Sequence, residues 1–254
     1  ASIFHDIFVV VLKIPNVFRK LFAEGAFSQA FIPIYSEYIG SKDEKGSQDF
    51  LNALFGILLS ALFIFTTLAL LFAPVFILIF APGFYFDVQK QDLAVSLLRI
   101  MFPYLALISL VAFAAGIQNS HNKFSIPALT PLIFNLSLIC SAWLVAPKID
   151  IPVMALAWGV LLAGFLQLLF QIAPLASIKK IPVPKIDFQN PGVKKFFILI
   201  LPAIVAGGIA QINLLVDTIF ASLLITGSPT WLYVSDRLIQ FPMGIFAIAI
   251  GTVL

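Results

Sequence analysis

The chain has 254 residues, of which 61% are hydrophobic and only 11% are charged, and its formal net charge is +3. A soluble globular domain carries about 25% charged residues, so this composition excludes a soluble domain of such length. The apolar residues gather in runs of about 18 or more, which is the length that crosses hydrocarbon as a helix. The sequence therefore predicts an all-α fold, a polytopic transmembrane helix bundle.

About seven membrane-spanning segments are expected. In chain order they are residues 4–38, 50–81, 93–117, 126–145, 153–175, 196–224 and 230–254. The first is too long for one straight span, and Pro15 and Pro33 are expected to kink it or to end its membrane portion. The chain does not begin with Met and stops inside an apolar run, so we expect a portion of a longer protein.

The longest polar connection, residues 177–195, contains three prolines and is the predicted boundary between two lobes. We expect one lobe at residues 1–178, an inter-lobe loop at 179–195 and the start of a second lobe at 196–254. Loops on the side of this boundary hold eight lysines: Lys42, Lys45, Lys123, Lys179, Lys180, Lys185, Lys194 and Lys195. The other side holds Lys90 and Lys148. Because lysine and arginine are enriched in cytoplasmic loops, the inter-lobe loop is predicted to be cytoplasmic.

Charged residues inside the spans are the most informative ones, because each costs about 2.5–3.5 kcal/mol at a helix centre. The first segment carries Asp6, Lys13, Arg19, Lys20 and Glu24. On an ideal helix four of these fall within about 40° of one another, and Arg19 points about 120° away. The alternative to a functional polar face is snorkelling combined with internal ion pairs.

Later spans hold fewer polar groups. Arg237 lies in the last segment, shortly before Pro242, and is expected to be functional. Asn213 and Asp217 share a helix face in the sixth segment, where hydrogen bonding between helices is an equal alternative. Arg99 of the third segment fits an ion pair or snorkelling as well as it fits a function.

The sequence contains no His-Glu-x-x-His, no phosphate-binding glycine-rich loop and no Gly-x-Ser-x-Gly motif. Its single cysteine, Cys140, and its two histidines form no zinc pattern. We therefore expect no enzymatic activity, no cofactor, no metal and no nucleic-acid partner. A membrane cavity with fixed cations suits an anionic cargo, and a lipid-linked anion also suits the apolar surroundings.

Residues 13–31 read KIPNVFRKLFAEGAFSQAF and are followed by IPIYSEY. This stretch resembles the second transmembrane helix of the MurJ/MviN lipid II flippases, members of the multidrug/oligosaccharidyl-lipid/polysaccharide exporter superfamily. Further agreement comes from Pro202 with Gln211-Ile212-Asn213 and Val216-Asp217, from Asp236-Arg237 with Phe241-Pro242, and from Gly251-Thr252-Val253-Leu254.

The resemblance implies a two-lobe exporter fold of fourteen helices, of which this chain covers about the second to the eighth. The first lobe here would then lack its first helix. The implied function is to move lipid II, an undecaprenyl-pyrophosphate-linked disaccharide pentapeptide, from the inner to the outer leaflet of the bacterial inner membrane by alternating access. The implied partners are lipid II, membrane lipids and other proteins of cell-wall synthesis.

By position, Arg19 and Arg237 match family arginines that line the central cavity, so both are expected to bind the pyrophosphate. The residue after Arg19 is often arginine in the family and is Lys20 here, which keeps the charge but loses bidentate geometry. Lys13 and Lys20 are expected to add positive potential.

Two acidic positions also match. Asp6 and Glu24 are expected to position the cations or to pair with them when the cavity is empty.

Two alternatives remain open from the sequence. One is a related transporter, either a polysaccharide-lipid flippase or a cation-coupled drug exporter, although a drug exporter for cations should show unpaired acidic residues in its cavity. The other is a non-transporting membrane scaffold of cell-wall synthesis, whose function would survive loss of the cavity charges.

Overall fold

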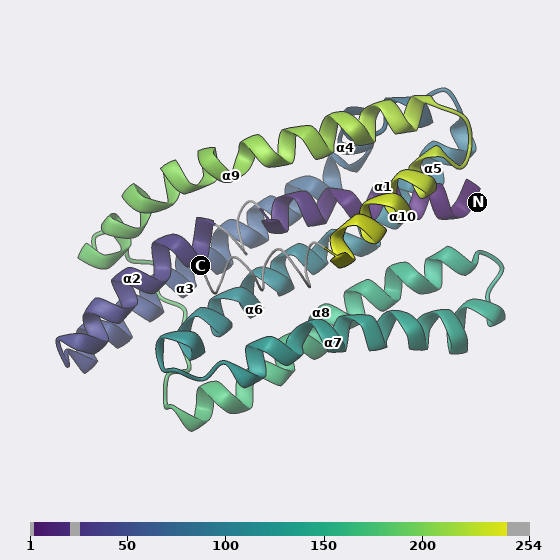
Figure 1. Ribbon diagram of the computed structural model, residues 1–254. Coiled ribbons are helices and arrows are strands. Elements are labelled where there is room, and N and C mark those ends of the chain that lie inside the picture. The colour runs from purple at the N-terminus through teal and green to yellow at the C-terminus, as the bar shows by residue number, and fades with distance from the viewer. Residues whose placement is uncertain (1–2, 21–25, 243–254) are drawn as a thin grey trace.

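The structure, a computed structural model, describes residues 3–20 and 26–242 and shows an elongated bundle of helices (Figure 1). Within these ranges every regular element is helical, which confirms the all-α prediction. The α-helices are α1 (Ile3–Arg19), α2 (Ala26–Gly40), α3 (Glu44–Leu71), α4 (Ala73–Phe80), α5 (Val88–Met101), α6 (Pro103–Ser120), α7 (Ser125–Cys140), α8 (Pro152–Ser177), α9 (Pro191–Leu223) and α10 (Ser228–Pro242).

Short helical turns extend some of these helices. They are η2 (Pro82–Phe84), the π-helical η3 (Ser141–Val145) and η4 (Ala146–Lys148).

Five helical stretches in the described ranges are long and apolar enough to cross a membrane, which confirms a polytopic membrane protein. They are Glu44–Leu71, Val88–Ser120, Ser125–Lys148, Pro152–Ser177 and Pro191–Leu223. Each corresponds to one of the seven expected spans. The first and last expected spans contain shorter described helices, since α1 has 17 residues and α2 and α10 have 15 each.

The prolines of the first segment lie inside helices, Pro15 in α1 and Pro33 in α2. Neither therefore marks a helix end. Each proline lacks the N–H that would bond to the carbonyl one turn earlier, so each weakens its helix locally without terminating it.

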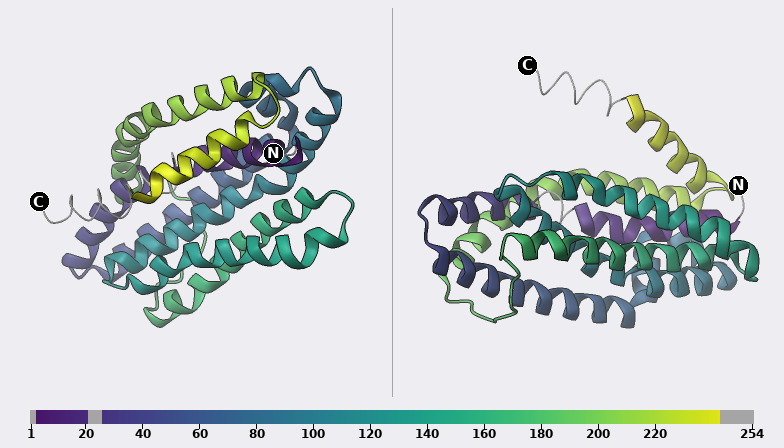
Figure 2. Two further views of the ribbon diagram at one scale, coloured as in Figure 1. Left: turned by 45° about the vertical axis from the view of Figure 1, so that its right-hand side comes forward. Right: turned by 90° about the horizontal axis from the view of Figure 1, so that it is seen from below.

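Connections between helices gather at the two ends of the bundle. The α2–α3, α6–α7 and α8–α9 connections lie at one end, and the α4–α5, α7–α8 and α9–α10 connections lie at the other (Figures 1 and 2). The eight lysines named above lie in the first group of connections or at the start of the helix that follows, and we call this end the lysine-rich end. We call the other the opposite end.

The buried apolar residues form two clusters. One surrounds α1, which is buried along most of its length and packs against α4, α5, α6, α8, α9 and α10. The other lies at the lysine-rich end and is rich in aromatic rings: Phe31 stacks on Tyr35 and on Phe50 with centroid distances of 5.3 and 5.9 Å. Stacked rings at such distances add stabilisation beyond the area they bury.

The connection between α8 and α9 is held against α3. The backbone N–H of Val183 donates to Asn52 Oδ1 at 2.8 Å, and that of Lys185 donates to the Asn52 carbonyl at 3.1 Å. Gly56 permits this approach, because a Cβ there would collide with the Lys185 backbone. The connection is therefore an ordered segment packed on α3 and not a free linker.

Helix α9 begins at Pro191, earlier than the expected residue 196. The side chain of Asn190 accepts hydrogen bonds from the N–H groups of Gly192 and Val193 at 2.9 and 3.3 Å, as an N-cap residue does. Pro191 suits the first helical position because its missing N–H would be unpaired there in any case. From this start α9 runs the length of the bundle along its outside (Figure 1).

Candidate functional site

A cavity of about 540 Å³ opens between α1, α2, α6, α7, α8 and α10. This volume lies within the roughly 300–1,000 Å³ that is typical of small-molecule sites. Its wall combines apolar side chains with polar ones, among them Asn16, Arg19, Asn119, Asn135, Gln167 and Arg237. We call it the arginine cavity.

Both arginines singled out from the sequence line this cavity, although they are far apart in the chain. Arg19 is the last residue of α1 and is half-buried. Arg237 is exposed on α10, where its Nε donates to the Tyr233 hydroxyl at 3.3 Å and its guanidinium lies 5.3 Å from the centre of that ring. This contact between a cation and an aromatic face helps to fix the direction of Arg237.

The charged residues described in the cavity wall are both basic. Among the described residues that line it, the two arginines carry charge and no aspartate or glutamate is present. Two fixed cations in one cavity wall favour an anion, and the guanidinium fork matches the geometry of phosphate oxygens.

The predicted lysines lie in different surroundings. Lys13 is half-buried and is not part of the described cavity wall. Lys20 is exposed, directly after α1. Glu24 lies outside the described residues. The binding roles expected for these three residues stay predictions.

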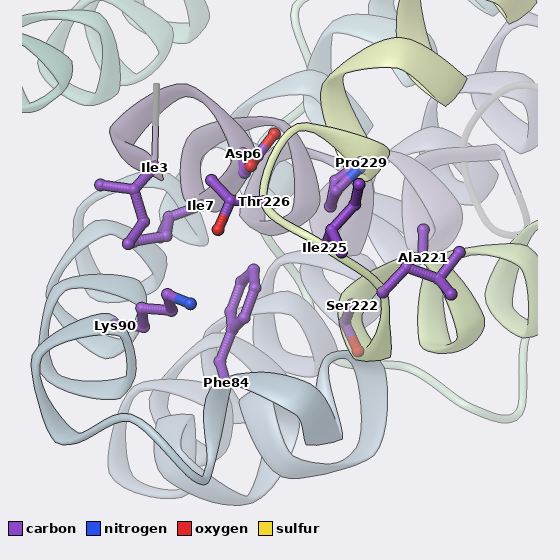
Figure 3. Close-up of a pocket in the computed structure, with 11 residues that line it drawn as sticks. Ile3, Asp6, Ile7, Phe84, Lys90, Ala221, Ser222, Ile225, Thr226 and Pro229 are labelled. Atoms are coloured by element: carbon purple, nitrogen blue, oxygen red, sulfur yellow. The ribbon is translucent and has the colours of Figure 1, made fainter. Parts of the chain in front are cut away.

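Asp6 is almost fully buried, at 3% exposure, and lies at the opposite end. Its carboxylate accepts hydrogen bonds from the Gly227 N–H at 2.6 Å, the Thr230 N–H at 3.2 Å and the Thr230 hydroxyl at 2.5 Å. Figure 3 shows Asp6 beside the loop that leads into α10. We call Asp6, Gly227 and Thr230 the Asp6 latch.

The chemistry of the latch follows from its place at a helix start. The first N–H groups of α10 have no partner within the helix, and a carboxylate there satisfies them and is favoured by the helix dipole. Gly227 has φ +106°, a conformation that glycine adopts without strain. Because the latch fixes the first turn of α10, it also helps to place Arg237 two turns further along that helix.

A second contact at the same end joins η2 to α9. The N–H of Gly83 in η2 donates to the Ser222 hydroxyl at 3.2 Å, near the end of α9. A Cβ at Gly83 would collide with the Ser222 backbone, so only glycine allows η2 to lie this close. Between these contacts is a pocket of about 20 Å³, with Lys90 and Phe84 on its wall (Figure 3), which has room for about one water molecule.

The sequence reasoning did not identify the uncharged polar residues of the cavity, such as Asn119, Asn135 and Gln167. Their signal was an amide side chain in an otherwise apolar helix, which is weaker than a charge because amides also bond between helices. Within residues 3–20 and 26–242, no group of three His, Cys, Asp or Glu residues is arranged to hold a metal ion.

Comparisons with known proteins agree with the fold. A family model described as "Lipid II flippase MurJ" matches residues 1–254. A probable lipid II flippase MurJ of Buchnera aphidicola subsp. Acyrthosiphon pisum is 42% identical over 254 residues, which are 100% of this chain and 50% of the relative. Another, of Haemophilus influenzae, is 41% identical and covers 98% of this chain and 50% of the relative.

A solved structure described as "Lipid II flippase MurJ, inward closed conformation" has a TM-score of 0.82 and 30% identity, and covers 100% of this chain and 52% of that one. The chain therefore spans about half the length of the relatives that it matches. Since the family model covers every residue and the architecture agrees as well, the chain belongs to the lipid II flippase MurJ family.

Proposed function

We propose that the whole protein, of which this chain is about half, moves lipid II from the inner to the outer leaflet of a bacterial inner membrane by alternating access, and that it is a transporter and not an enzyme. The observation that carries this proposal is that Arg19 and Arg237 line one cavity whose described wall holds no carboxylate. Lipid II offers that cavity a pyrophosphate, and its lipid tail suits the surrounding bilayer.

The rival functions fit this cavity less well. A drug exporter for cations needs acidic groups in its binding site, and the described wall has none. A scaffold for cell-wall synthesis has no need of arginines in a cavity, where their partial desolvation is costly. A related polysaccharide-lipid flippase remains the nearest alternative, since it too would handle a pyrophosphate.

The remaining predicted residues support the arginines. Lys13 and Lys20 add positive potential near the cavity without touching its described wall. Asp6 acts at a distance, by capping the helix that carries Arg237. Glu24 is proposed to pair with a cation of the same segment.

We further propose that residues 1–178 and 196–254 belong to two lobes joined by 179–195. Alternating access needs two lobes that move around a shared site. Under this assignment the Asp6 latch links one lobe to the other and has to open when the cavity opens at that end.

The lysine-rich end is proposed to face the cytoplasm, because eight lysines lie there against two at the other end. A cysteine at position 189, with Cys140 replaced, should resist impermeant thiol reagents added outside the cell. Labelling of this cysteine from outside the cell would refute the predicted topology.

The arginines provide the direct test of function. In the full-length protein, Arg19→Ala and Arg237→Ala should each weaken lipid II binding roughly tenfold to a hundredfold, because a charge-assisted hydrogen bond contributes about 1.5–3 kcal/mol. Arg→Lys should be intermediate, since lysine keeps the charge without the fork. The measurement is lipid II exposure on the outer leaflet at matched expression. Normal exposure in both alanine variants would refute the proposal.

A further inference from the structure

Two glutamines of α8, Gln167 and Gln171, lie one turn apart and are both buried, at 2% and 0% exposure. Both bond to the same residue of α7: Gln167 Nε2 donates to the Thr130 carbonyl at 3.0 Å, and Gln171 Nε2 donates to the Thr130 hydroxyl at 2.8 Å. They therefore look equivalent as links between two helices.

Their side-chain oxygens differ. Oε1 of Gln171 accepts a hydrogen bond from Gln118 Nε2, so that amide is satisfied on both sides. Oε1 of Gln167 is buried and has no partner among the described residues, and Gln167 lines the arginine cavity whereas Gln171 does not. A buried acceptor without a hydrogen bond is unfavourable, and a ligand in the cavity could supply the missing donor.

Helix α7, which also lines the cavity, has a backbone carbonyl that lacks a hydrogen-bond donor in the same way. Pro127 and Pro131 both line the cavity. Pro131 has no N–H, so the Pro127 carbonyl lacks the partner that an α-helix would give it. The lining of the cavity also includes the amide side chains of Asn119 from α6 and Asn135 from α7. We call Asn119, Pro127, Asn135 and Gln167 the amide wall.

The amide wall carries hydrogen-bonding groups but no charge, whereas the guanidinium groups come from α1 and α10. The free groups of Gln167 and Pro127 are carbonyl oxygens, which accept hydrogen bonds from N–H and O–H groups and cannot donate to a phosphate oxygen. The two kinds of wall thus suit two chemically different parts of one ligand.

We propose that the amide wall binds the uncharged part of the cargo headgroup, which is rich in N–H and O–H groups, while Arg19 and Arg237 bind the pyrophosphate. This inference rests on the proposed function and deepens it. It makes Gln167 and its neighbours specificity determinants, which distinguish a lipid with a sugar–peptide headgroup from a bare polyprenyl pyrophosphate.

The test compares two ligands on the purified full-length protein: lipid II and undecaprenyl pyrophosphate, which share the tail and the pyrophosphate. Gln167→Leu should weaken lipid II binding about fivefold, the value of one net hydrogen bond, and leave the affinity for undecaprenyl pyrophosphate unchanged. Gln171→Leu is the matched control. It breaks a bond to the same threonine, so it should lower thermal stability without changing the ratio of the two affinities.

Asn135→Ala gives an independent reading if Gln167→Leu does not fold, because Asn135 is exposed toward the cavity on α7. It should shift the affinity ratio in the same direction. An equal loss for both ligands, or no loss for lipid II in a stable variant, would overturn the amide-wall proposal while leaving the arginine proposal intact. Failure of the wild-type protein to bind either ligand would overturn both.

Discussion

The last two described helices, α9 and α10, meet the rest of the bundle at both of its ends, and the two contacts differ in kind. At the lysine-rich end the start of α9 packs on rings: Phe196 meets Phe27 at 5.5 Å between centroids, and Gly192 lies against Phe50. At the opposite end the contact includes the hydrogen bonds of the Asp6 latch and the hydrogen bond from Gly83 to Ser222. Between the two, the most apolar stretch of α9 is not buried.

The difference matters because the two kinds of contact respond differently when the helices move relative to each other. Apolar packing has no strong direction and weakens gradually as surfaces slide. Hydrogen bonds to a buried carboxylate are directional, and breaking them leaves a desolvated charge without partners, so this contact is either made or lost. We therefore expect the contact at the lysine-rich end to persist as a pivot while α9 and α10 move. The Asp6 latch is expected to have two states, one with its hydrogen bonds formed and one with them broken.

The largest expected effect comes from the latch. Asp6→Ala removes three hydrogen bonds and leaves the donors of Gly227 and Thr230 unsatisfied, so stability should fall by about 2–4 kcal/mol. Asp6→Asn keeps one acceptor oxygen and should lose less. Thermal unfolding and lipid II exposure of the full-length variants measure both effects. An unchanged melting temperature in Asp6→Ala would mean that the latch contributes nothing to this state.

A smaller effect is expected at the aromatic contact. A Cβ at Gly192 would lie 2.6 Å from a ring carbon of Phe50 and 2.9 Å from the Tyr38 hydroxyl. Gly192→Ala should therefore destabilise the protein by about 1–3 kcal/mol through overpacking.

Gly207 offers a matched control on the same helix, because nothing lies within 4 Å of its added Cβ. Gly207→Ala should be neutral or stabilise the protein by up to about 1 kcal/mol through helix propensity. Equal destabilisation by both substitutions would show that α9 needs its glycines for flexibility and not for close packing.

The smallest effect is expected for the ion pair between Lys195 and Glu37, which joins α9 to α2 at the lysine-rich end. Both side chains are largely exposed, so the pair should contribute about 0–1 kcal/mol and less as salt is added. Glu37→Gln should change the melting temperature slightly at low salt and not at high salt. A large fall in melting temperature that persists in high salt would show that this ion pair, and not the aromatic packing, is the main stabilising contact at the lysine-rich end.

Some of these features could be predicted from the sequence because they depend on local signals. Long apolar runs predicted the membrane class, and residues 13–31 carried the family resemblance. Arg19 and Arg237 could be recognised as candidates because a charge in a membrane span is costly wherever it lies. The cap at Asn190 and Pro191 was equally local, and a capping argument would have placed the start of α9 correctly.

The roles of individual charges were less accessible. A helical wheel grouped Asp6, Lys13 and Lys20 and set Arg19 apart, yet Arg19 is the one of these four that lines the cavity. A wheel gives the direction of a side chain around its own helix and not what packs against that direction.

The sequence by itself determined that this chain is a bundle of membrane helices carrying costly cations, because hydropathy and charge are properties of single segments. Only the tertiary structure decided that Asp6 caps a helix 221 positions away. It also decided that Gln167 faces the cavity while Gln171 is fully bonded. Both outcomes depend on which helices lie side by side, and the sequence of one segment does not specify which other segments pack against it.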